Sequence, residues 1–236
     1  MPKVYIEGPV GKIEGMMHSA ENPKAPVAIV LHPHPLYGGT MNNKITYHLY
    51  KSFVQNGCSV IRINFRGVGK SHGKFDSGRG EAEDVGIVLD WLHVQFPEAS
   101  HFWLAGFSFG AYVGLNVVMR RPEIEAFIVV APPVTKYSFA FFSPCPVSGM
   151  ILQGDADDIA LIADTESLIN LNHNQKNVTV EYHVIESADH FFSKHMEEFD
   201  ETIASYIKYC IDNRVVSSVV KQRKRSKGRK KKGVSV

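Results

Sequence analysis

Two hydrophobic periodicities alternate along the chain. Short runs of β-branched and aromatic residues predict strands, and segments with apolar residues at three- and four-residue steps predict helices. The strand-like runs are VYIEG near the start and residues 12–18, 27–32, 59–65, 101–107, 126–131, 147–154 and 178–185. The helix-like segments lie at residues 42–56, 81–96, 109–120, 160–172 and 194–212.

The order of these segments indicates an α/β protein. Alternating strands and helices are typical of parallel strands joined by crossover helices. Residues 27–32 and 126–131 are apolar at nearly every position, as expected of strands covered on both faces. A few residues around Gly8–Gly11 separate the first two strands, which predicts an antiparallel hairpin. We expect one mostly parallel sheet of about eight strands, with this hairpin at one edge and helices on both faces.

Charge divides the chain into two parts. The net charge of +2 conceals nine Lys and Arg residues, and no acidic residue, between positions 221 and 232. Without those nine, the chain has 17 basic and 24 acidic residues. We therefore expect an acidic globular domain at residues 1–212 and a basic, disordered tail at residues 213–236. Such a tail is a candidate for weak contact with nucleic acid or an anionic surface.

Composition excludes several protein classes. The chain has 236 residues and is 44% hydrophobic, which suits a folded domain with a real core. No run approaches the roughly 20 apolar residues of a transmembrane segment, and the first residues show no apolar signal segment. The three cysteines are widely separated and odd in number, which favours reduced thiols and a cytoplasmic location. The sequence does not indicate an oligomeric state.

A G-x-S-x-G motif stands between a predicted strand and a predicted helix. The residues are Gly106-Phe107-Ser108-Phe109-Gly110. In this setting the turn is so sharp that the serine adopts a strained backbone conformation, and side chains at the flanking glycines would collide with the strand and the helix. Ser108 is therefore the candidate nucleophile.

A serine nucleophile needs a base and an orienting acid, which in this architecture follow it in the order Asp or Glu, then His. His190 follows the last predicted strand and is the candidate base. We prefer it to His173, His183 and His195, which fall within predicted helix or strand. Asp157 is the candidate acid, Asp155 is the alternative on the same loop, and Asp158 is a candidate to begin or cap the next helix.

These motifs resemble those of the α/β-hydrolase superfamily, and more closely those of small, capless bacterial hydrolases related to dienelactone hydrolases and serine peptidase-like esterases. The similarity runs from about residue 4 to residue 212 and rests on LHPHPLYGGTMNNK, RINFRGVGKSHGKFDSGRGE, GFSFGA, QGDADD and ADHFF. It implies a Ser-Asp-His triad. In related enzymes the acid stands three residues after the glycine that ends the seventh strand, which supports Asp157.

The oxyanion hole of such an enzyme uses two backbone N–H groups. The resemblance implies that Phe109 and His34 supply them. Pro33 and Pro35 flank His34 and have no N–H, which leaves His34 as the donor at this point of the loop and stiffens its backbone.

Two other motifs have rival interpretations. His32 and His34 have the spacing of a metal pair, but no further ligands stand nearby to complete a site, so we expect no metal and no cofactor. Gly69-Lys70-Ser71 resembles the end of a phosphate-binding loop, but Asn64 stands where that motif requires glycine. We expect residues 66–81 to form a structured loop at the rim of the site, with Arg66 held by a nearby acid.

Residues 132–146 are too few for a lid domain and carry several aromatic side chains. Three of them, Tyr137, Phe141 and Phe142, are candidate residues of the substrate pocket. Tyr37 is a fourth candidate. The alternative is that these aromatic residues only cover the core.

The sequence therefore predicts a serine hydrolase acting on a small ester, thioester or related acyl substrate, with peptide hydrolysis left open. The alternative is an inactive hydrolase fold used for binding, with its basic tail contacting nucleic acid.

Overall fold

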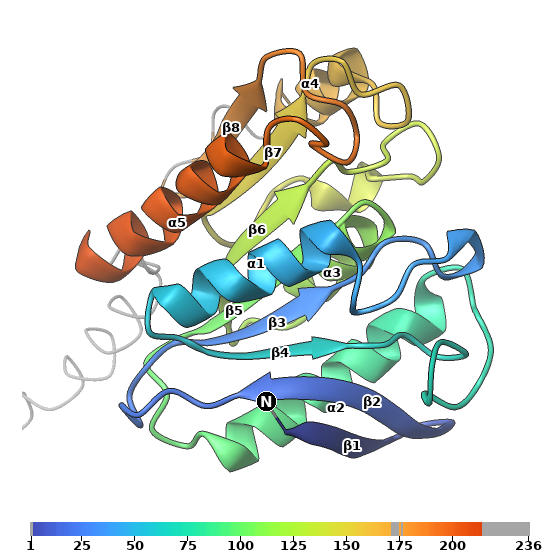
Figure 1. The fold of residues 1–236 in the computed structure, drawn as a ribbon, viewed down its shortest axis with the longest axis vertical. Coiled ribbons are helices and arrows are strands. Elements are labelled where there is room, and N and C mark those ends of the chain that lie inside the picture. Colours follow the sequence, from blue (N-terminus) through green and yellow to red (C-terminus); the bar gives the residue numbers. More distant parts are fainter. Residues whose placement is uncertain (1, 171–174, 176, 214–236) are drawn as a thin grey trace, which may run out of the picture.

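Eight strands form a single mixed sheet in the computed structural model, which describes residues 2–170, 175 and 177–213 (Figure 1). The strand order is β1-β2-β4-β3-β5-β6-β7-β8. The strands are β1 (Lys3–Gly8), β2 (Gly11–His18), β3 (Val27–Leu31), β4 (Ser59–Ile63), β5 (Phe102–Phe107), β6 (Ile124–Val130), β7 (Gly149–Gly154) and β8 (Val180–Ile185). The prediction of eight strands is confirmed.

The described part of the chain contains five α-helices and two short 3-10 turns, all between strands except the last helix, which follows β8. Each predicted helix is present, with ends that differ by a few residues from the expected ones. The helices are α1 (Lys44–Gln55), α2 (Arg79–Gln95), α3 (Phe109–Val118), α4 (Ile162–Asn170) and α5 (Met196–Asn213), and the turns are η1 (Pro35–Tyr37) and η2 (Ala140–Phe142).

The predicted hairpin is confirmed at one edge of the sheet. Strands β1 and β2 pair antiparallel, and β2 also pairs antiparallel with β4. Gly11 begins β2 at φ +111°, in the left-handed region that glycine adopts without strain. The remaining pairs, from β4 through β8, are parallel.

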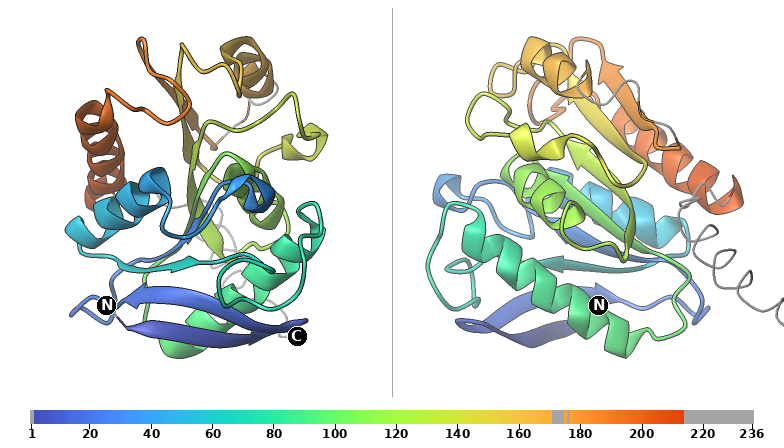
Figure 2. Two further views of the ribbon diagram at one scale, coloured as in Figure 1. Left: turned by 45° about the vertical axis from the view of Figure 1, so that its right-hand side comes forward. Right: turned by 180° about the vertical axis from the view of Figure 1, so that it is seen from behind.

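Helices cover both faces of the sheet (Figures 1 and 2). Because side chains alternate along a strand, Val27, Ile29 and Leu31 of β3 belong to the core beneath α2 and α3. Ala28 and Val30 belong to the second core, beneath α1 and α5. Burial on both faces explains why the sequence of β3 is apolar at every position.

The parallel strands end on the same side of the sheet, as the arrowheads of β3, β4 and β6 show in Figure 1. Loops at this edge follow β3, β5, β7 and β8 and carry the candidate residues. In open α/β sheets this edge is where ligands bind.

Several further expectations concern the tail, membrane-spanning segments and the cysteines. The predicted basic tail falls almost entirely on residues 214–236, which lie outside the described residues. In the described part of the chain, no helix has the length and apolarity needed to cross a membrane. Cys58, Cys145 and Cys210 are all buried.

Candidate active site

Ser108 occupies the sharp turn between β5 and α3. Its backbone has φ 54° and ψ −116°, a strained combination for a residue with a side chain. A Cβ atom at Gly110 would lie 2.5 Å from the carbonyl oxygen of Leu31, and one at Gly106 would overlap the carbonyl oxygen of Gly110. Both glycines are therefore required by close backbone approach, as the motif predicted.

His190 lies on the loop after β8, and its ring contacts Ser108. The distance from His190 Nε2 to Ser108 Oγ is 3.2 Å, and Nδ1 lies 2.7 Å from Asp157 Oδ2. Because a carboxylate only accepts hydrogen bonds, Nδ1 carries the proton and Nε2 is left to accept from the serine hydroxyl. His190 and Asp157 are 3% and 4% exposed, so the hydrogen bond between them is shielded from water.

The carboxylate of Asp157 is fixed from its other side. Its Oδ1 accepts hydrogen bonds of 2.8 Å from the backbone N–H groups of Ile159 and Ala160. Asp155, the alternative acid, accepts instead from the backbone N–H of Ser187 and so joins the loops after β7 and β8. Asp158 is exposed and precedes the start of α4 by four residues, so it does not begin or cap that helix.

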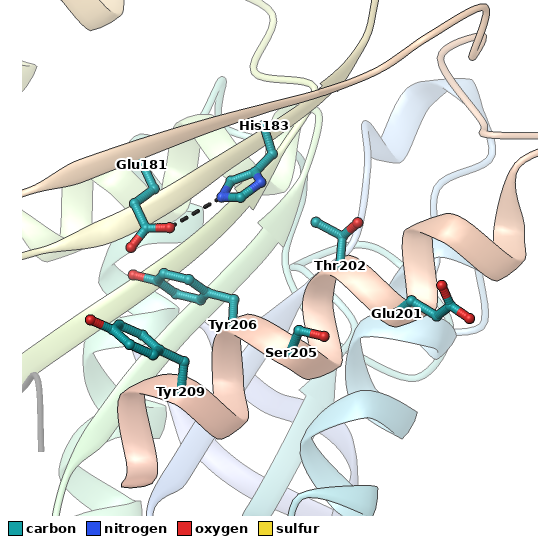
Figure 3. A pocket seen from close by; sticks show the side chains of 7 residues that line it. All are labelled: Glu181, His183, Glu201, Thr202, Ser205, Tyr206 and Tyr209. Atoms are coloured by element: carbon teal, nitrogen blue, oxygen red, sulfur yellow. Dashed lines mark hydrogen bonds and ion pairs between the residues drawn. The ribbon is translucent and has the colours of Figure 1, made fainter. Parts of the chain in front are cut away.

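The other histidines considered are not brought to Ser108. His183 lies on β8 beside Glu181 and lines a separate hollow of about 520 Å³ between β8 and α5 (Figure 3). His195 stands just before α5, not within a helix as expected, and its carbonyl accepts from the N–H of Phe199. His173 lies outside the described residues.

His32 is fully buried at the start of the loop after β3. Its Nε2 accepts a hydrogen bond of 3.0 Å from the backbone N–H of Phe65, so Nδ1 carries the proton and donates to the carbonyl of Pro33 at 2.6 Å. Burial lowers the pKa of His32 to about 4, which keeps the ring neutral. Both ring nitrogens are occupied, which leaves no lone pair for a metal.

The hydrogen bond from His32 sets the direction of the next amide. The carbonyl of Pro33 and the N–H of His34 belong to one planar peptide group and point in opposite directions. Holding the carbonyl therefore aims the His34 N–H. Within the described residues, the N–H groups of His34 and Phe109 donate to no protein group. The His34 ring packs 5.0 Å from the ring of Phe109, measured between centroids.

A cavity of about 280 Å³ opens at this point. Ser108, His190 and His34 line it, together with Tyr37, which the sequence analysis selected. Asn43, Lys136, Ile159 and Phe191 also line it, and sequence reasoning missed them. Phe191 had a signal in its position next to His190, whereas Lys136 and Asn43 come from segments far from the triad motifs.

The aromatic residues of the segment between β6 and β7 lie elsewhere. Phe142 is fully buried in the core, 5.8 Å from Phe127 between ring centroids, so its expected role as a pocket wall is corrected. Tyr137 stacks on Tyr112 at 4.5 Å, and Phe141 packs against the same tyrosine. Neither lines the cavity, because both rings pack against Tyr112 of α3.

Residues 66–78 form a loop between β4 and α2 that packs beside the cavity. Arg66 donates to both carboxylate oxygens of Asp84 on α2, each at 2.8 Å, which confirms the expected acidic partner. Phe75 of this loop lies 4.9 Å from the His34 ring, measured between centroids. The described residues contain no cluster of three or more His, Cys, Asp or Glu side chains suited to a metal ion.

Residues 19–208 match the model of the X-Pro dipeptidyl-peptidase (S15) family. The chain belongs to this family. It is therefore a member of the α/β-hydrolase superfamily, consistent with its sheet order and with the turn at Ser108.

Relatives in bacteria support the same assignment. The uncharacterized protein RP471 of Rickettsia prowazekii is 51% identical over 211 residues, which cover 88% of this chain and 89% of RP471. ATU1826 of Agrobacterium tumefaciens, a protein of unknown function, is 40% identical with a TM-score of 0.88, over 92% of this chain and all of that chain. XC6422 of Xanthomonas campestris, an α/β serine hydrolase without a lid, is 31% identical with a TM-score of 0.78, over 88% and 94% of the two chains.

Proposed function

We propose that this protein is a serine hydrolase that cleaves a small ester, thioester or related acyl bond through Ser108, His190 and Asp157. The observation that carries this proposal is the continuous hydrogen-bonded chain from Ser108 Oγ through the His190 ring to the Asp157 carboxylate. A hydroxyl next to an oriented imidazole is activated as a nucleophile, whereas an isolated hydroxyl is not.

The proposed reaction has two halves. Ser108 Oγ attacks the acyl carbon while its proton moves to His190 Nε2, and the same proton then goes to the departing alcohol or thiol. The acyl group is left on Ser108. A water molecule next attacks this acyl-enzyme and loses a proton to His190. His190 Nε2 then passes that proton to Ser108 Oγ as the bond to the acyl group breaks and the carboxylic acid leaves. Asp157 holds the imidazole in one tautomer and stabilises it when it becomes positively charged.

Negative charge develops on the substrate carbonyl oxygen in both halves. We assign its stabilisation to the backbone N–H groups of His34 and Phe109, which have no partner among the described residues. The second of these begins α3, whose N-terminal end favours a developing anion. The hydrogen bond from His32 keeps the first donor in place before the substrate arrives.

An ester fits the cavity better than the peptide substrate that the family's description names. A dipeptidyl-peptidase must bind the positively charged amino terminus of its substrate, a task suited to a carboxylate. None of the described residues that line the cavity is an Asp or a Glu, and Lys136 adds a positive charge. Repulsion between two positive charges disfavours a substrate with a free amino terminus.

Hydrolysis of p-nitrophenyl acetate and butyrate tests the proposal. Ser108→Ala should lower kcat by about 10⁶-fold, because the members of a triad act as a unit. Ser205→Ala, on the exposed surface of α5, is the matched control and should keep the full rate. A fluorophosphonate probe should label the protein and its control but not Ser108→Ala. Equal rates for all three proteins would refute the proposal.

A further inference from the structure

The cavity at Ser108 carries a positive charge without a balancing negative one. Lys136 is the side chain of fixed positive charge among its described lining residues, none of which is acidic. The carboxylate of the triad, Asp157, is 4% exposed behind His190 and already accepts three hydrogen bonds. A ligand in the cavity therefore experiences Lys136 and not a neutral pair of charges.

Lys136 is held by its backbone and free at its tip. Its N–H donates to the carbonyl of Pro133 at 3.0 Å, which fixes the turn that brings it to the cavity. In the part of the chain that the structure describes, its ammonium group makes no ion pair with a carboxylate. The pKa of the His34 ring is lowered first by burial and then by the charge of Lys136, which reflects the proximity of the two side chains.

We propose that the substrate of this site is a small ester that carries a carboxylate on its acyl or alcohol portion, and that Lys136 binds this carboxylate. The inference rests on the proposed hydrolase function and specifies its substrate class. An ammonium ion and a carboxylate form a charge-assisted hydrogen bond, which is about twice as strong as one between neutral groups.

Asn43 adds a second free donor to the same cavity. Its Oδ1 accepts from the N–H groups of Ile45 and Thr46 at the start of α1, so the orientation of its amide group is fixed. The Nδ2 end is consequently the end left to donate, and among the described residues it has no acceptor. A carboxylate with two oxygens is able to use both donors.

The uncharged part of such an ester also has a place to bind. Tyr37 and Phe191 line the cavity and are 84% and 47% exposed, so they present apolar surface at its mouth. The cavity volume of about 280 Å³ is just below the usual range for drug-sized ligands. Both features favour a short carbon skeleton over a long acyl chain or a polymer.

Two matched sets of esters test the inference, one with the charge on each portion. Monomethyl glutarate, methyl hexanoate and the methyl ester of γ-butyrobetaine carry an anionic, a neutral and a cationic acyl group. The para-carboxyphenyl, para-isopropylphenyl and para-trimethylammoniophenyl acetates vary the alcohol in the same way. The measurement is kcat/KM for each ester near neutral pH, by acid release in a pH-stat.

We expect the anionic ester of at least one set to have a kcat/KM about fivefold above that of its neutral partner, because the Lys136 side chain is exposed and an ion pair at an exposed site provides a gain of about this size. Lys136→Ala should bring this ratio to about one, and Lys136→Glu should favour the cationic ester. Lys136→Arg should retain the preference. Lys194→Ala, which removes an exposed lysine that does not line the cavity, is the matched control and should leave the ratio unchanged.

Salt separates a charge effect from a change of shape. Raising the ionic strength from about 0.02 M to about 0.5 M should reduce the anionic preference of the wild type and leave the neutral rate nearly constant. The inference is overturned if neither set shows an anionic preference, or if the preference survives Lys136→Ala. In that case, Ser108-dependent hydrolysis of the neutral esters still upholds the proposed function. Loss of all Ser108-dependent hydrolysis and of fluorophosphonate labelling overturns both.

Discussion

Acidification should destabilise the folded protein through His32. This ring is neutral in the folded protein, where burial lowers its pKa from 6.5 to about 4. An unfolded chain exposes the ring to water and restores the ordinary pKa. Between these two values the unfolded state binds a proton that the folded state does not, so the free energy of unfolding falls as the pH falls. The contribution is fully lost only below about pH 4.

The size of the effect follows from the two pKa values. Each pH unit between them contributes up to about 1.4 kcal/mol, so the drop from about pH 7 to about pH 5 costs roughly 2 kcal/mol. Folded domains typically have a free energy of unfolding of about 5–15 kcal/mol, so this loss is a large share of the total. The structural reason is specific: a protonated ring has a second N–H where the Phe65 N–H now donates.

Urea unfolding of the wild type and of His32→Gln at both pH values measures this contribution. Glutamine has an amide that donates and accepts but does not titrate in this range. The variant should be less stable at neutral pH, and the stability gap should narrow by roughly 2 kcal/mol at the lower pH. His72→Gln, at an exposed histidine, is the control and should keep the wild-type dependence on pH. A gap between wild type and His32→Gln that stays constant with pH would refute the reasoning.

The same variant tests how the His34 N–H is aimed. If His32 orients the Pro33–His34 peptide group, His32→Gln should lower kcat for p-nitrophenyl butyrate and leave KM nearly unchanged, because the oxyanion exists only beyond the ground state. Complete loss of one oxyanion donor costs about 10²–10³-fold in kcat, which is the upper limit here. A change confined to KM would assign His32 to substrate binding instead.

Three further substitutions separate catalytic from structural roles. Asp157→Asn should lower kcat by about 10⁴-fold in the p-nitrophenyl butyrate assay, because the imidazole loses its orienting acceptor, whereas Asp155→Asn should keep kcat nearly unchanged. Asp84→Ala should cost up to about 3–5 kcal/mol in urea unfolding, because it leaves the buried Arg66 guanidinium with only the exposed carboxylate of Asp76, 3.9 Å away. Phe142→Ala should cost about 3–5 kcal/mol of stability without changing KM, as expected of a core residue; a changed KM with unchanged stability would return it to the pocket.

The fold and the Ser108 turn were predictable because their signals are local. Hydrophobic runs predict strands, and the glycines beside Ser108 predict a turn that only close backbone approach explains. His190 and Asp157 also follow strands, and the ends of neighbouring parallel strands converge at one edge of a sheet. Sequence position alone therefore brings three distant side chains to one place.

The pocket was less predictable because its wall comes from irregular segments. Residues 132–146 show no periodicity, so the sequence does not reveal which of their side chains turn inward. Phe142 packs into the core and Lys136 reaches the cavity, the reverse of what hydrophobicity alone suggested for a pocket wall. The choice between Asp155 and Asp157 as the triad acid likewise depends on tertiary contacts. Asp155 accepts a hydrogen bond from Ser187, whereas Asp157 accepts one from His190.

The segment His32-Pro33-His34 shows how a local signal acquires its meaning from tertiary contacts. Its prolines identify His34 as a backbone donor, but nothing in the sequence says where that N–H points. The answer comes from Phe65, thirty-three residues from His32, whose backbone N–H fixes the His32 tautomer so that Nδ1 must donate to the Pro33 carbonyl. His32 and His34 have the spacing of two metal ligands, but they act differently here. The buried ring of His32 holds the Pro33–His34 peptide group, and the N–H of that group faces the site. Protonation of His32 in acid should therefore lower the free energy of unfolding and also disturb the alignment of the His34 N–H.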